Sequence, residues 1–158
     1  MFEDILPLYG LNIYESTVEP FGDGLINHTW LVKNSRGNYI LQRVNTEVFK
    51  NPENIDKNLS VIKKYLDEYY PDYLFVSPVT ALSGHSLLAT ENGHYRMFPF
   101  VQGSTSVNSL TNEEEAFEAA RQFGRFSRLL AGFDAGQLAI TIPDLHNLSL
   151  RYNQFSNA

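Results

Sequence analysis

Phe21-Gly22-Asp23-Gly24-Leu25-Ile26-Asn27-His28-Thr29-Trp30-Leu31-Val32 is the stretch that decides the fold. A second stretch, Tyr39-Ile40-Leu41-Gln42-Arg43-Val44-Asn45, follows it after a short turn. Together they predict a strand, a glycine loop, a strand, a tight turn and a third strand that ends in a basic residue. Two glycines allow backbone N–H groups to approach phosphate oxygens, and a basic side chain neutralises phosphate charge. The pattern is typical either of a phosphate-binding loop or of an ordinary hairpin tip.

Helix and strand signals continue on both sides of this region. A short amphipathic piece is expected within 1–14, a strand at 17–20, and strands again at 76–82 and 86–90. Asn51 and Pro52 begin a helix that ends before Pro71. The Asn92-Gly93 pair predicts a hairpin into a strand that stops at Pro99.

The last third of the chain reads as a linker followed by helices. A polar linker occupies 102–110, and Thr111-Asn112-Glu113-Glu114 is a capping box that opens a helix over 111–132. A short helical fragment is expected near the C-terminus. The predicted fold class is α+β, with a five-stranded antiparallel sheet, one helix, a linker and further helices.

Composition narrows the class of partner and compartment. The 158 residues carry a net charge of −6, which disfavours nucleic acid and anionic membranes as partners. The chain has no cysteine, so disulfides and thiolate metal sites are excluded. The N-terminal stretch lacks the pattern of a signal peptide, and we expect a cytoplasmic protein.

Four motifs carry a resemblance to a known family. They are 21–32, 39–45, Val48-Phe49-Lys50-Asn51-Pro52-Glu53 and Tyr95-Arg96-Met97-Phe98-Pro99-Phe100-Val101. In this order they resemble the aminoglycoside phosphotransferase and choline kinase-like family, and most closely its bacterial N-acetylhexosamine 1-kinases. The resemblance implies a kinase-like N-terminal lobe at 1–101, a linker at 102–110, and an incomplete start of the C-terminal lobe at 111–158.

The resemblance also implies a set of nucleotide-binding residues. The glycine loop would cover the phosphates, and Arg43, or less probably Lys50, takes the position of the family's third-strand cation. Residues 98–101 would form the hinge that reads the adenine edge, with Leu41 and Met97 beside the base, although core packing is the simpler role for Met97. The full expected set is Gly22, Asp23, Gly24, Leu25, Ile26, Asn27, Thr29, Leu41, Arg43, Met97, Phe98, Phe100 and Val101.

His146 and Asn147 match a run that lines the acceptor side of the cleft in the family, although a His-Asn pair after a proline is also typical of a turn or cap. The expected cofactors are ATP and Mg²⁺, and the expected acceptor is a hydroxyl of an amino sugar such as an N-acetylhexosamine. The family's catalytic His-x-Asp-x-x-x-x-Asn loop and its later Mg²⁺-binding Asp are not in these 158 residues. No catalytic residue or metal ligand is therefore assigned, and the chain alone is expected to be inactive.

Two functions remain open. The first is the N-terminal part of an ATP-dependent small-molecule kinase, with a nucleotide and a small-molecule substrate as partners. The alternative is a non-catalytic module of kinase-like fold that binds a nucleotide or a partner. Under this second reading the helix at 111–132 would expose an apolar face, and self-association through it is expected.

Overall fold

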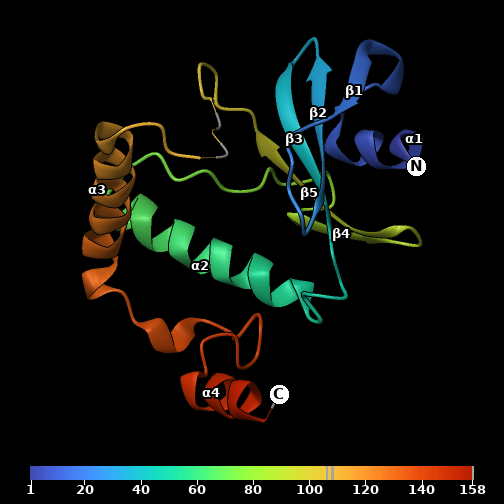
Figure 1. The fold of residues 1–158 in the computed structure, drawn as a ribbon. Helices are drawn as coiled ribbons and strands as arrows, with labels where there is room; N and C mark the ends of the chain where they lie inside the picture. The colour runs from blue at the N-terminus through green and yellow to red at the C-terminus, as the bar shows by residue number, and fades with distance from the viewer. Residues whose placement is uncertain (106, 108, 158) are drawn as a thin grey trace.

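The computed structural model describes residues 1–105, 107 and 109–157. Two residues of the predicted linker, 106 and 108, lie outside this set. An antiparallel sheet of five strands forms the centre of the N-terminal part (Figure 1). The strands are β1 (Ser16–Pro20), β2 (His28–Asn34), β3 (Gly37–Val44), β4 (Leu87–Thr90) and β5 (Gly93–Pro99), in the order β1-β2-β3-β5-β4. The predicted five-stranded antiparallel sheet and the α+β class are confirmed.

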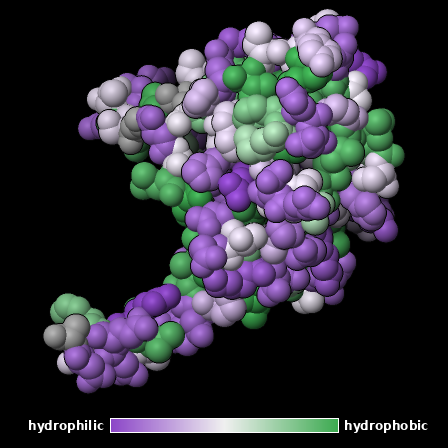
Figure 2. Space-filling model, turned by 90° about the vertical axis from the view of Figure 1, so that its right-hand side faces the viewer, coloured by the Kyte–Doolittle hydropathy of each residue, from purple (hydrophilic) through white to green (hydrophobic). Residues whose placement is uncertain are grey.

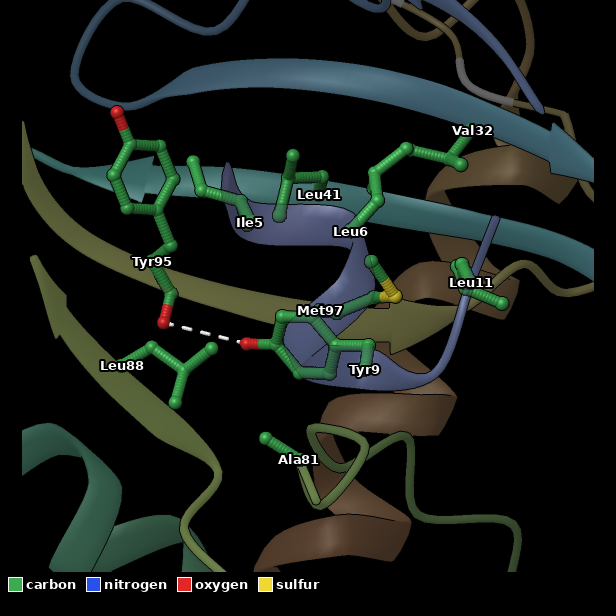
Figure 3. Packing of buried hydrophobic residues seen from close by; sticks show 10 residues of the cluster. All are labelled: Ile5, Leu6, Tyr9, Leu11, Val32, Leu41, Ala81, Leu88, Tyr95 and Met97. Carbon is green, nitrogen blue, oxygen red and sulfur yellow. Dashed lines mark hydrogen bonds between the residues drawn. The ribbon is translucent and has the colours of Figure 1, made fainter. Parts of the chain in front are cut away.

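The N-terminal segment covers one face of the sheet. Helix α1 (Phe2–Ile5) and the 3₁₀ turn η1 (Leu6–Tyr9) bury Ile5, Leu6 and Tyr9 against it. Figure 3 shows these side chains packed on the strands, with the Tyr9 hydroxyl donating to the Tyr95 carbonyl at 3.5 Å. Burial, and to a lesser extent the charge of Asp56, raises the pKa of the Tyr9 phenol above its ordinary value. The main hydrophobic core therefore lies on this face.

Strand alternation decides which side chains join that core. Trp30, Leu41 and Met97 are paired across β2, β3 and β5, and all three belong to the packed cluster. Their neighbours along each strand point to the other face, because successive side chains in a strand alternate. One such row is Leu31, Ile40 and Phe98.

Helix α2 (Pro52–Tyr69) runs below the sheet in Figure 1. Its N-terminal half meets the sheet through Glu53, which lies 3.5 Å from His94 of β5, and through Asp56, whose carboxylate accepts a hydrogen bond from Ser86. Further along the helix, the Asn58 amide pairs with both backbone groups of Ala139, at 2.8 Å each. Helix α2 thus joins the sheet to the C-terminal part of the chain.

The C-terminal part contains α3 (Glu113–Leu129), the 3₁₀ turns η3 (Leu130–Gly132) and η4 (Ala135–Gln137), and α4 (Leu148–Ser156). Helix α3 packs on 73–76 through Phe126, whose ring stacks near Tyr73 and Phe75. The arm that ends in α4 projects from the rest of the molecule (Figure 2). No helix in the described residues is long and apolar enough to cross a membrane.

Two local predictions were wrong. Residues 76–82 form no strand, because Pro78 lacks a backbone donor and the segment makes only isolated hydrogen bonds, such as Val79 N–H to the Met97 carbonyl. The capping box lies one residue later than Thr111–Glu114. Asn112 caps the Glu115 N–H, and the Glu115 carboxylate accepts from both the backbone and the hydroxyl of Thr111.

Candidate functional site

A pocket of about 290 Å³ opens on the face of the sheet opposite the N-terminal segment. The glycine loop, β3, the segment 73–79 and the residues after β5 each contribute to its walls. Its lining residues are Phe21, Ile40, Val76, Phe98, Pro99, Phe100, Val101, Ser104 and Thr105. The walls are mostly apolar and aromatic, which is typical of a site for a small planar ligand.

Two aromatic rings connect the glycine loop with the segment after β5. Phe21 packs edge-on against Phe100, with ring centroids 5.9 Å apart and an interplanar angle of 83°. The loop end is fixed because the Phe21 N–H donates to the Thr29 carbonyl, and the Phe100 N–H donates to the Asn38 carbonyl. These contacts fix the mouth of the pocket between the loop and the chain segment 98–101.

The backbone of 98–101 has one donor left for a ligand. Pro99 has no N–H, and the Phe100 N–H is taken by Asn38. The Val101 carbonyl accepts from the Ser104 backbone and hydroxyl. Among the described residues the Val101 N–H has no acceptor. Val101 is one of the residues that line the pocket.

A polar row crosses the sheet next to this pocket. Thr29 of β2 is paired with Gln42 of β3, which is paired with Arg96 of β5. The Gln42 amide nitrogen donates to the Thr29 hydroxyl at 3.3 Å, and its oxygen accepts from Nε and Nη2 of Arg96 at 3.1 and 3.0 Å. Strand alternation places this row on the same face as Ile40 and Phe98.

The positive charge of the row is half-buried. Burial lowers the pKa of the Arg96 guanidinium, while the negative charge of Asp56 on α2 raises it. The guanidinium also lies over the Phe98 ring, 5.1 Å from its centroid, so it borders the pocket wall directly.

The glycine loop forms a second, smaller concavity next to the pocket. Gly22 has φ of 72°, a left-handed conformation that favours glycine. Gly22, Gly24, Asn27 and Thr29 are among the residues that line a hollow of about 270 Å³. The Asn27 side chain accepts from the Asn45 N–H at 3.0 Å, which ties the loop to the end of β3. At the loop tip, Leu25 is 99% exposed and Ile26 is also exposed.

Three of the predicted nucleotide-binding residues lie on the other face of the sheet. Leu41 and Met97 are 0% exposed and belong to the core under the N-terminal segment. Arg43 is paired with the buried Tyr95, so its strand position belongs to that face too. Its guanidinium lies so close to Gly93 that a Cβ there would be 2.8 Å from Nε. Phe98, Phe100 and Val101, in contrast, line the pocket.

His146 and Asn147 lie apart from this pocket. Asn147 caps α4 by accepting from the Leu150 N–H at 3.0 Å, and it also donates to Asp144. In Figure 1 the start of α4 and the linker after β5 lie on opposite sides of α2. The structure therefore gives Asn147 a capping role and does not bring the pair to the pocket.

The expected nucleotide-binding set did not include several residues of this site, among them Phe21, Ile40, Gln42, Val76 and Arg96. For Arg96, the strand register in the sequence carried a signal. The Asn92-Gly93 hairpin fixes where β5 starts, and the apolar Tyr95 and Met97 mark one face, which leaves Arg96 and Phe98 on the other. No three or more His, Asp or Glu side chains gather as a metal site within the described ranges.

No protein-family model matches the chain. Among solved structures, the chain is similar to spectinomycin phosphotransferase APH(9)-Ia, crystallised with ADP and spectinomycin. The TM-score is 0.54 at 13% sequence identity, over 84% of this chain and 38% of that chain. The likeness shows the fold: this chain has the kinase-like α+β fold of that phosphotransferase, and it spans 38% of its length.

Proposed function

We propose that the chain is the N-terminal, nucleotide-binding part of an ATP-dependent small-molecule kinase. The observation that carries the proposal is the apolar pocket between Phe21 and the segment 98–101, which has a half-buried arginine at its border. An adenine ring would lie between Ile40 and Val76, with its edge toward the Val101 N–H. The kinase-like fold and the ADP found in APH(9)-Ia support this assignment.

The phosphates would lie under the glycine loop. Gly22 and Gly24 carry no side chain between the loop backbone and the hollow beneath it. Asp23, Leu25, Ile26 and Asn27 belong to the same proposed loop, and Thr29 lies at the start of β2, directly after it. When bound, Mg²⁺ would neutralise phosphate charge, and its ligands are expected from the family's Asp and Asn motifs, which are not in these 158 residues.

The proposed acceptor is a hydroxyl of an amino sugar such as an N-acetylhexosamine. Its support is the resemblance of the four sequence motifs, with His146 and Asn147 as the proposed acceptor-side contacts. We expect no turnover by the 158-residue chain, which carries no His-x-Asp-x-x-x-x-Asn loop. A polypeptide that adds such a loop should phosphorylate an N-acetylhexosamine in a panel that includes amino alcohols and aminoglycosides. Activity on none of them would contradict the acceptor assignment.

Nucleotide binding itself is tested by calorimetric titration of the chain with ATP and adenosine. Val76→Glu introduces a carboxylate into the pocket wall and should abolish binding of both ligands. Leu82→Glu is the matched control, because Leu82 is an exposed apolar residue outside the pocket. Failure of the wild-type chain to bind any nucleotide would contradict the proposal, and so would equal binding by the two variants.

The second candidate function, a partner-binding module, is favoured by the exposed face of α3. Phe117 and Phe123 are 65% and 75% exposed on this helix. Its first turn is acidic (113–115) and its last turn contains Arg128. A second copy of α3 packed antiparallel would bury the phenylalanines and pair opposite charges. Sedimentation velocity should then show a dimer that Phe123→Glu dissociates, and a monomeric wild type would contradict self-association.

A further inference from the structure

The polar row that borders the proposed nucleotide pocket carries its positive charge on β5, at Arg96. In protein kinases a lysine on the third strand acts on the nucleotide phosphates and pairs with a glutamate on the next helix. Here the third-strand residue in this polar row is Gln42, which is neutral. The residue directly opposite it across the ladder is Arg96. A cation therefore occupies the same row of the sheet, one strand further along.

Hydrogen bonds hold this arginine in one orientation. Two of its five N–H donors, one on Nε and one on Nη2, go to the Gln42 oxygen. Gln42 is held in turn by its bond to Thr29 on β2, the strand that follows the glycine loop. Three guanidinium N–H groups remain for an anionic ligand. The planar group rests over Phe98, which keeps it at the pocket wall.

We propose that Arg96 supplies the positive charge for the phosphates of the bound nucleotide and that Gln42 positions it. The inference rests on the proposed nucleotide-binding function and assigns a new residue to that site. Asp56 on α2 accepts a hydrogen bond from Ser86, and its negative charge opposes the lowering of the Arg96 pKa by burial. Under this proposal the cation of the lobe lies on β5 instead of β3.

The alternative cation, Arg43, is badly placed for this role. Its strand position faces the core side with Tyr95, whereas the pocket is on the Ile40 side. Moving Arg43 to the pocket would require a one-residue slip of β3, which would also turn Leu41 out of the core. Assigning the phosphate cation to Arg96 or to Arg43 therefore predicts opposite effects of the two substitutions on ATP affinity.

The test compares the affinities of ATP and adenosine for single-charge variants of the 158-residue chain. Arg96→Met should weaken ATP binding about tenfold or more and leave adenosine affinity unchanged, since only ATP has phosphates for the guanidinium. Arg96→Met should also flatten the salt dependence of ATP affinity. Lys57→Met removes an exposed charge from α2 and is the matched control. Arg43→Met tests the rival position.

A double variant tests whether Arg96→Met weakens ATP binding through the loss of positive charge or through a change in structure. Gln42→Lys combined with Arg96→Met returns the cation to β3 and should restore ATP affinity above that of Arg96→Met alone. Gln42→Leu should weaken ATP but not adenosine binding, because it releases the guanidinium without removing it. Thermal melts check that each variant is folded.

The possible failures can be told apart. If Arg96→Met binds ATP as tightly as the wild-type chain does, the phosphates do not use Arg96 and the inference is overturned. A loss of ATP affinity in Arg43→Met but not in Arg96→Met would also overturn it and would favour the sequence-based assignment. If neither ligand binds the wild type, the proposed nucleotide pocket itself fails.

Discussion

Replacing Phe21 with alanine should open the mouth of the pocket and weaken the binding of adenosine. Phe21 and Phe100 form an edge-to-face pair with centroids 5.9 Å apart, at the junction of the glycine loop and the segment after β5. Such pairs contribute about 0.5–1.5 kcal/mol beyond the area they bury. If binding depends on the closed mouth, the loss corresponds to about a two- to tenfold lower affinity.

A double-mutant cycle isolates this contact. The chain is compared with Phe21→Ala, Phe100→Ala and the double variant, using chemical unfolding for stability and calorimetry for adenosine affinity. We expect a coupling energy of about 0.5–1.5 kcal/mol in unfolding, together with a lower adenosine affinity in each single variant. Phe21→Leu keeps an apolar wall and should lose less affinity than Phe21→Ala. Additive unfolding effects with unchanged adenosine binding would refute the role of the pair.

Three further predictions concern stability. Leu6→Ala should lower the free energy of unfolding by about 2–5 kcal/mol, because the side chain is fully buried under the sheet; a loss within error in urea unfolding would contradict this. Asn58→Ala removes both bonds to Ala139 and should speed proteolysis within 133–147 while the sheet stays protected; unchanged cleavage would count against this docking role. Hydrogen bonds from Thr111 hold the pKa of Glu115 below its ordinary 4.5, so the stabilisation of α3 by the ionised Glu115 exists at neutral pH and is lost as the pH falls through the folded pKa. Glu115→Gln should therefore lower the helical circular dichroism of α3 at neutral pH only. An equal effect of this variant in acid would refute the prediction.

Much of the fold was readable from the sequence because its signals are local. The hairpin pair Asn92-Gly93, the helix start at Pro52 and the alternation in β2 and β3 each fix one element without reference to the rest. A strand was wrongly predicted at 76–82 because the sequence pattern of an extended apolar stretch is the same whether or not it pairs with another strand. Only the tertiary contacts show that its backbone bonds are isolated.

The site was harder to predict because it depends on which face of the sheet is covered. The N-terminal segment buries the face of Leu41 and Met97, and nothing in the period-2 pattern of β3 says which face that will be. The resemblance places the third-strand cation at Arg43 or Lys50, and neither assignment depends on which face of β3 is covered. Arg96 became visible only when β3 and β5 were paired residue by residue.

The central claim is that a nucleotide binds on the pocket face and not on the face covered by the N-terminal segment. Amide nuclear magnetic resonance spectra of the labelled chain, titrated with ATP, test it most directly. The account predicts shifts for Phe21, Ile40 and Val101, with little change for Leu6 and Tyr9 on the opposite face. No shifts at saturating ATP, or shifts confined to the N-terminal face, would contradict it.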